Sequence, residues 1–459
     1  MSAARLARID LPDFGMPEQR PVVPSSRYRE RLAALRARAD DRGYSHLVVY
    51  ADREHSANLA FLTGFDPRFE EALLVVGRRD DAPAILVGNE CWGTAGAAPL
   101  PLRRHRFQDF SLPNQPRDRS RPLSEILAEE GIGPGAHVGV LGWKGFADRA
   151  TIEVPSFIAD TIRELAGARG VVENANELLI DPADGLRVVN DVDQLAVFEH
   201  AACQTSDGIR RLLAGLRLGM TEAEAVRLLN WNGAPLSCHL MLTAGPRAAF
   251  GLLSPGDRPI GHGDPLTVAF GIWGALNCRA GFVVEDERGL PDGVGDYVDR
   301  LVAPYFEAVA AWYGALRVGV TGGELQAVID ERLGEPFFGI GLNPGHLLHL
   351  DEWVSSPVWR GSTVELRSGM ALQVDIIPAT GTPWFTTNIE DGVALADESL
   401  RAAFAAAHPA AWRRTQARRA FMRDALGIDL HADVLPLSNI PAFLPPYLLR
   451  PELAMTITR

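Results

Sequence analysis

The sequence has 459 residues, of which 47% are hydrophobic and 22% are charged, a balance typical of a globular protein with more than one domain. Its 58 acidic and 45 basic residues give a formal net charge of -13, which argues against nucleic acid and against an anionic membrane surface as partners. We therefore expect a small-molecule substrate. The four cysteines are widely scattered and the start of the chain lacks a signal-peptide pattern, so we also expect a cytoplasmic protein.

The first part of the chain alternates between two kinds of pattern. After a proline-rich arm (1–20), short apolar runs at 46–51, 71–76, 84–88 and 137–143 are separated by helix-like segments at 25–44 and 156–167. Strands that alternate with amphipathic helices are typical of a layered α/β domain. We place this N-terminal domain at residues 21–185.

The second part, residues 186–428, contains an internal repeat. "LRLGMTEAEAVRLL" starts at Leu216 and "LRVGVTGGELQAVI" starts at Leu316, each after a long amphipathic segment. A single repeat at this spacing predicts two similar halves related by a pseudo-twofold axis, with a ligand site between them. The remaining residues, 429–459, form an apolar, proline-rich tail, which we expect to pack on the body of the protein or on a partner subunit.

Several acids and histidines of the second part occur where burial is expected. "NPGHLLHLDEW" contains His346, His349 and Glu352, while Asp375 and Glu390 stand in the apolar runs 369–378 and 386–395. An acid in a buried strand costs several kcal/mol unless it is paired or binds a ligand. Each acid taken alone has a structural interpretation, as a solvated loop residue or a local ion pair. Their combination favours a site.

The order of these motifs resembles a known family. "ANLAFLTGF", "QLAVFEHAACQTSDGI", "LTAGPRAAFGLLSPGDRPIGHGD", "GMALQVD" and "NIEDG" follow one another as in the creatinase, aminopeptidase P and prolidase family, and the resemblance spans residues 28–395. It implies a creatinase-like α/β N-terminal domain followed by an α+β pita-bread domain with the pseudo-twofold repeat.

The resemblance also implies positions for metal ligands. Peptidases of the family hold two divalent metals with five side chains, two of which are aspartates eleven residues apart. Here Ala269 and Ala280 occupy those two places. The other three places fall on His346, Asp375 and Glu390. The two-metal centre is therefore expected to be degenerate.

Because alanines replace both aspartates, we predict a reaction that uses no metal or other cofactor. We expect a metal-independent, creatinase-like enzyme that cleaves a C–N bond, with His346 or His349 as general base and with Glu390 or Asp375 orienting it or protonating the leaving nitrogen. One alternative is a pita-bread protein that binds a ligand or peptide without catalysis. The other is a one-metal Xaa-Pro-type peptidase that uses His346, Asp375 and Glu390 as ligands.

The substrate is expected to carry a carboxylate or guanidino group. Arg279 and Asn277 stand one and three positions before Ala280, beside the vacated ligand position, and offer donors to such a group. We assign further substrate contacts to His239, Trp273 and Glu352. Cys278 is a possible nucleophile, although a buried structural thiol is the commoner case.

We also expect a homodimer. In creatinase-like dimers the loop after the "FLTG" turn resembles a lid that reaches the site of the partner subunit. The resemblance therefore implies a substrate contact for Arg68 and Phe69, whereas the structural interpretation is a surface loop.

Overall fold

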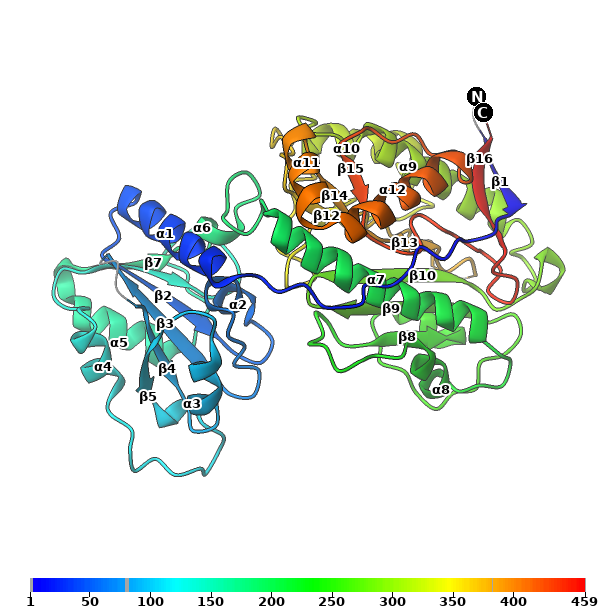
Figure 1. Cartoon of the computed structure of the whole chain (residues 1–459). Helices are drawn as coiled ribbons and strands as arrows, with labels where there is room; N and C mark the ends of the chain where they lie inside the picture. Colours follow the sequence, from blue (N-terminus) through cyan, green and yellow to red (C-terminus); the bar gives the residue numbers. More distant parts are fainter. Residues whose placement is uncertain (1–2, 79–81, 382, 459) are drawn as a thin grey trace. The chain divides into compact units, whose positions relative to one another are not determined.

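The computed structural model describes residues 3–78, 82–381 and 383–458, which form two compact units (Figure 1). Unit 2 is Val23–Arg187, and unit 1 combines Met1–Val22 with Val188–Arg459. The sequence places the corresponding break between residues 185 and 186. None of the helices in the described ranges combines the length and the apolarity that crossing a membrane requires.

Unit 2 is built on one six-stranded mixed sheet, with the strand order β5-β4-β3-β2-β6-β7. Its strands are β2 (His46–Ala51), β3 (Ala72–Gly77), β4 (Ala84–Val87), β5 (Arg103–Arg106), β6 (His137–Leu141) and β7 (Val171–Asn174). Its helices are α1 (Ser25–Asp41), α2 (Ala57–Thr63), α3 (Cys91–Thr94), α4 (Leu123–Glu129), α5 (Ser156–Ala166) and α6 (Glu177–Ile180). The predicted α/β layer is confirmed.

Helix α5 shows why this layer forms. Its apolar residues Ile158, Ile162 and Ala166 recur at the helical period and are buried, so they share one face. That face joins a core that includes Val138 and Val140 of β6. The sheet and the helix thus bury each other's apolar side chains, and the unit has a core of its own.

Unit 1 contains two four-stranded sheets, with the orders β13-β10-β9-β8 and β11-β12-β14-β15, and the two-stranded ribbon β1-β16. Its strands are β1 (Ala3–Arg8), β8 (Met241–Ala244), β9 (Pro265–Ile272), β10 (Ala275–Phe282), β11 (His346–Leu347), β12 (Ala371–Gln373), β13 (Asn388–Glu390), β14 (Gly392–Leu395), β15 (Val434–Pro436) and β16 (Leu453–Thr458). Its helices are α7 (Val192–Gly215), α8 (Glu222–Val226), α9 (Ala303–Ala315), α10 (Gly322–Leu333), α11 (Glu398–Ala407) and α12 (Pro409–Asp424). Helix α7 packs against β9 and β10 (Figure 1).

The predicted internal repeat is visible at two helix starts. Thr221 caps α8 and Thr321 caps α10, and in each case the glutamate three residues later completes a capping box. This reciprocal arrangement satisfies backbone donors at a helix start. The two copies therefore adopt the same local structure at a spacing of 100 residues, which is 321 minus 221.

Strands β9 and β10 form an antiparallel hairpin in which Cys278 lies opposite Ala269, and Cys278 also lies opposite Glu390 on β13. Because side chains alternate between the two faces of a sheet, Ala269, Cys278 and Ala280 belong to one face. Asn277 and Arg279 belong to the other face. This alternation decides which residues of β10 reach the site.

The two ends of the described chain belong to the body of unit 1. Strand β1 of the N-terminal arm pairs with β16 of the tail, Ala3 opposite Thr458, and both strands appear side by side in Figure 1. Strand β15 extends a four-stranded sheet, and most residues of 434–448 are buried. The apolar tail, expected to pack on the body of the protein or on a partner subunit, is thus part of the core of unit 1.

Candidate functional site

A cavity of about 570 Å3 opens in unit 1 against the sheet β13-β10-β9-β8, each strand of which contributes to its lining. Its walls are mostly apolar and include exposed side chains at the rim. Acidic and amide groups line another part of it. The apolar lining includes Met241, Phe250, Leu252, Leu276, Leu342, Trp353, Ile377, Pro378 and Phe385; the polar lining is Cys238, Thr267, Cys278, Glu352, Asp375, Thr386, Asn388 and Glu390.

The backbone fixes the position of His346 at this site. His346 begins β11 and pairs with Gln373 of β12. The residue before it, Gly345, has a φ of +125°, and a Cβ there would lie 3.0 Å from the ring of Trp312. Glycine is therefore required for the chain to turn into β11 at this angle.

Three carboxylates converge on the Nε2 atom of His346. Glu352 Oε1 lies 3.1 Å away, Glu390 Oε1 3.5 Å and Asp375 Oδ2 3.9 Å. Glu390 ends β13 and Asp375 follows β12, so short strands place both. Glu352 comes from the loop after β11, and its side chain is 25% exposed, whereas the other three side chains are buried.

Several atoms of this group have unused hydrogen-bonding capacity. His346 Nε2, Asp375 Oδ1 and Glu390 Oε1 are buried and lack a hydrogen-bond partner. The carboxylates thus lie within ion-pair distance of Nε2, but their orientation does not make hydrogen bonds with it. The ring of Trp353 stacks on His346 with centroids 4.1 Å apart. Buried polar atoms normally have hydrogen-bond partners, so these three atoms are available to bind a ligand.

Burial and mutual charge shift the protonation of these groups. Burial raises the pKa of Glu390, and the charge of Glu352 adds to the effect. Burial, with the charge of Glu390, holds the pKa of Asp375 well above its usual range. Burial acts to lower the pKa of His346, but its contacts with Glu352 and Glu390 outweigh burial and raise that pKa to about 10. The cluster favours bound positive charge.

Cys278 is a further member of the site. Its buried thiol donates to Glu390 Oε2 over 2.8 Å, while the other oxygen of Glu390 faces His346. The pKa of the thiol is raised well above its usual value, first by burial and then by the charge of Glu390. The sequence contains a signal for this residue. Cys278 stands two positions before Ala280, so strand alternation puts both side chains on the same face of the sheet.

The fold family implies a metal, and these residues fit one. Ligand atoms of His346, Glu352 and Glu390 all lie within 4.8 Å of one another. Imidazole and carboxylate donors suit zinc, manganese, iron or cobalt. His346 Nε2 and Glu390 Oε1, which are buried without a hydrogen-bond partner, are ligand atoms that such an ion would bind. Asp375 lies slightly farther from His346 than the two glutamates do.

The structure contradicts the substrate contacts predicted for Arg279 and Asn277. Arg279 is 1% exposed and its Nη2 lies 2.9 Å from Asp391 Oδ2. Its Nε donates to the Phe443 carbonyl. Asn277 Nδ2 donates to Asp391 Oδ1 over 2.6 Å. Both side chains leave β10 on the face turned away from the cavity, so neither reaches a ligand there.

Of the other predicted residues in unit 1, His346 is outside the cavity lining but contacts the lining acids Glu352, Asp375 and Glu390. Three more residues are outside the lining and outside this group. His349 is buried, accepts from the Leu350 amide and meets the ring of Phe198 edge-on. His239 contacts the Leu252 carbonyl over 2.7 Å. Trp273 lies at the turn between β9 and β10. Of the predicted residues, the structure brings together His346, Glu352, Asp375 and Glu390.

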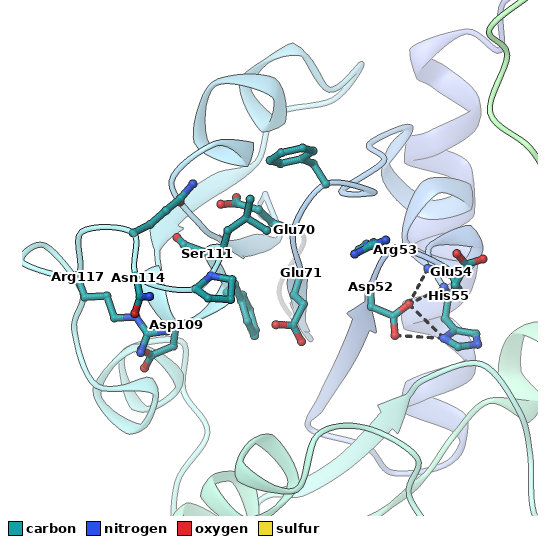
Figure 2. A pocket seen from close by; sticks show the side chains of 15 residues that line it. Asp52, Arg53, Glu54, His55, Glu70, Glu71, Asp109, Ser111, Asn114 and Arg117 are labelled. Carbon is teal, nitrogen blue, oxygen red and sulfur yellow. Dashed lines mark hydrogen bonds and ion pairs between the residues drawn. The ribbon is translucent and has the colours of Figure 1, made fainter.

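A larger cavity, about 960 Å3, lies in unit 2 (Figure 2). Two pairs of its charged side chains contact each other: Asp52 contacts the ring of His55, and Arg117 contacts Asp109. Among the described residues that line it, none has a fully buried polar atom without a hydrogen-bond partner. Size alone therefore does not make it the better candidate.

Phe69 lines this unit 2 cavity and is 55% exposed. Arg68 forms an ion pair with Asp66 at 3.5 Å. Phe69 is thus at the surface of its unit, whereas Arg68 is half-buried. Their predicted contact with the substrate of a partner subunit stays a prediction, as does the homodimer.

The comparisons with known proteins give one curated relative and many similar structures. The chain is 25% identical over 234 residues to the uncharacterized peptidase YqhT of Bacillus subtilis (strain 168). This match covers 48% of the chain and 63%, less than two thirds, of that relative. No family model matches the sequence.

The similar structures cover most of the chain. The prolidase from Thermococcus sibiricus has a TM-score of 0.63 at 18% identity, covering 81% of this chain and 95% of its own. The dipeptidase PepE from Mycobacterium ulcerans has a TM-score of 0.60 at 20% identity, with 83% and 95% covered. The Xaa-Pro dipeptidase from Bacillus anthracis has a TM-score of 0.61 at 16% identity, with 81% and 96% covered. The resemblance predicted from the sequence is confirmed at the level of the fold: this chain has the pita-bread fold of the creatinase, aminopeptidase P and prolidase family.

Proposed function

We propose that this chain is a hydrolase that cleaves an amide bond of a short peptide or peptide-like substrate, with one divalent cation held by His346, Glu352 and Glu390. The proposal follows the one-metal peptidase alternative of the sequence rather than the metal-independent reaction, but with Glu352 in place of Asp375 among the ligands. The observation that carries it is that His346 Nε2 and Glu390 Oε1 are buried without a hydrogen-bond partner, in a group of ligand atoms that also includes Glu352. The peptidase named YqhT and the structures titled prolidase and dipeptidase support the same reaction class.

The balance of charge supports a cation at this place. Three carboxyl groups surround one imidazole, so even a protonated His346 cannot neutralise them if all three are ionised. A buried excess of negative charge is costly. A divalent ion would offset much of that cost. It would also bind His346 Nε2 and Glu390 Oε1, which have no hydrogen-bond partner. When bound, it would supply a water of lowered pKa and would polarise the scissile carbonyl.

The chain's own residues would perform the remaining tasks. Asp375 lines the cavity, and its Oδ1 atom is unpaired, so it is placed to accept a proton from water. Its raised pKa makes it a stronger base than an exposed aspartate. Trp353 covers one face of the His346 ring and keeps that ring in place. Asn388 and Thr267 offer hydrogen bonds to the peptide backbone.

An activity assay tests this proposal. The purified protein is stripped with a chelator, supplied with Zn2+, Mn2+ or Co2+, and incubated with a library of short peptides that includes Xaa-Pro dipeptides. We expect hydrolysis with at least one added cation and none without it. Turnover that persists after complete removal of metal would instead support the metal-independent acid–base reaction predicted from the sequence.

Two variants separate the roles of the site residues. Asp375→Asn should lower kcat by roughly two to four orders of magnitude and should retain the cation, because Asp375 lies outside the proposed ligand group. His346→Ala should lose both the cation and the activity. Asp351→Asn, beside Glu352 in the same loop, is the matched control and should retain both. A library that is bound but never cleaved would favour the binding-protein alternative.

A further inference from the structure

We propose that Asn388 selects the substrate by accepting a hydrogen bond from the amide N–H that follows the scissile bond on its C-terminal side. This inference rests on the proposed function and names the substrate class, which is longer peptides and peptide amides rather than free dipeptides or esters. It is carried by the Asn388 side chain, which lines the cavity, is 6% exposed and has its Oδ1 atom buried without a hydrogen-bond partner.

The cation site does not use Asn388. Among the described residues that line the cavity, those with a buried side-chain atom lacking a hydrogen-bond partner are Asp375, Asn388 and Glu390. The proposed function takes Glu390 as a ligand and Asp375 as a base. The remaining atom, Asn388 Oδ1, is a neutral acceptor. Because buried acceptors normally have a donor, a bound molecule is expected to supply one.

The strand register explains why the neighbouring strand does not supply this donor. Asn388 lies opposite Ala280 of β10, and Glu390 lies opposite Cys278. Directly opposed side chains on a sheet are close enough to interact. The Cys278 thiol donates to Glu390, whereas Ala280 ends at its methyl group and has nothing to donate. The Asn388 oxygen therefore borders the cavity without a donor from β10.

Strand β13 also sets the distance between Asn388 and the cation site. Asn388 and Glu390 are two residues apart on this strand, so their side chains leave the same face with their Cβ atoms about 7 Å apart. The Asn388 side chain and its hydrogen bond cover part of this distance. One peptide unit, about 3.8 Å long, covers the rest. A substrate whose scissile carbonyl lies at Glu390 thus brings its neighbouring amide to Asn388.

The charges of the cavity indicate the direction of the peptide. Glu352 and Asp375 belong to the lining, and among the described lining residues there is no lysine or arginine. The positive amino end of a peptide is therefore attracted to the acids beside His346, and its C-terminal side extends toward Asn388. A carboxylate or ester there would place a second acceptor oxygen against Oδ1, whereas an amide N–H is complementary to it.

Binding to the chelator-treated, full-length protein tests the inference without hydrolysis. The probes are two derivatives of alanyl-leucine: the N-methylamide, which has the N–H, and the methyl ester, which has an oxygen in its place. In calorimetry the wild type should bind the methylamide roughly 10- to 100-fold more tightly than the ester, because the ester leaves a buried acceptor unpaired. Asn388→Leu, which removes the acceptor, should bind both probes equally, and so should the smaller variant Asn388→Ala.

Thr386→Val is the matched control. Thr386 lines the same cavity, but its hydroxyl already donates to the Pro378 carbonyl, so this variant should keep the wild-type preference. Equal or undetectable binding of the two probes by the wild type, or a preference that persists in both Asn388 variants, overturns the inference.

Turnover of the same probes by the metal-loaded protein separates this inference from the proposed function. Release of alanine from both probes with equal kcat/KM overturns the inference alone. A preference in binding that Asn388→Leu abolishes, without alanine release at any added cation, supports the amide contact and overturns the proposed function.

Discussion

Arg279 and Asp391 form a buried ion pair one position along β10 from the contact between Cys278 and Glu390. Arg279 Nη2 lies 2.9 Å from Asp391 Oδ2, and the same carboxylate oxygen accepts from the Ala442 amide. Because Cys278 and Arg279 are neighbours on β10, their side chains project from opposite faces of the sheet. One pair borders the cavity, and the other fastens the C-terminal segment to the core.

Replacing Arg279 with methionine should therefore destabilise the fold. Asp391 would keep its hydrogen bonds from Asn277 and Ala442 but would be a buried charge without an opposite charge, and breaking a buried pair in this way costs about 3–5 kcal/mol. Urea unfolding followed by fluorescence measures the loss. Arg360→Ala breaks an ion pair at the surface, where Arg360 is 78% exposed, and should leave the midpoint unchanged. An Arg279→Met protein of normal stability that no longer binds substrate would restore the role predicted from the sequence.

Met455→Ala tests whether the C-terminal strand belongs to the core. The side chain is fully buried in β16, and truncating a buried methionine typically costs about 2–5 kcal/mol. The change in the unfolding midpoint should be large for Met455→Ala and small for Thr458→Ala, whose hydroxyl bonds to the Ala3 carbonyl at an exposed position. Equal, small effects would mean that the tail packs loosely on the domain.

Much of the fold could be predicted from the sequence, because the strands of unit 2 and the internal repeat have strong local patterns. Asp375 and Glu390 could be placed because acids are rare in apolar runs, and His346 because the resemblance puts a metal ligand at that position. Arg279 was misplaced because its type suggested a substrate contact, whereas the face it occupies depends on strand register. Its partners at Asp391 and Phe443 lie far along the chain, and no local pattern connects them to it.

Ala269→Asp should add a metal ligand to the cavity. Ala269 lines the cavity opposite Cys278, and the resemblance places a carboxylate there in two-metal enzymes. We expect the cation content to rise from one toward two per chain in elemental analysis. Without metal the variant should be less stable by about 3–5 kcal/mol, because the new carboxylate is buried and unpaired. Ala269→Ser serves as the size control and should retain one cation; an unchanged content in Ala269→Asp would contradict the assignment of this face.

Substrates should not require a free carboxylate. Among the described residues that line the cavity there is no lysine or arginine, so a negatively charged end has no partner within it. Peptides with an amidated C-terminus and an apolar side chain should therefore be cleaved at least as well as the corresponding acids. Paired kcat/KM measurements on amidated and free peptides check this expectation. A preference of more than about tenfold, worth 1.4 kcal/mol, for the free acid would show that a cation outside the lining binds the carboxylate.

The central claim concerns one cation beside His346, and anomalous diffraction locates it most directly. Crystals of the protein soaked in Zn2+ are measured on both sides of the zinc absorption edge, with Glu390→Gln crystals as the comparison. The expected result is one strong anomalous peak among His346 Nε2, Glu352 and Glu390, absent from the variant. A map without a peak at this place, or with zinc bound only elsewhere, would contradict the proposed metal-assisted hydrolase.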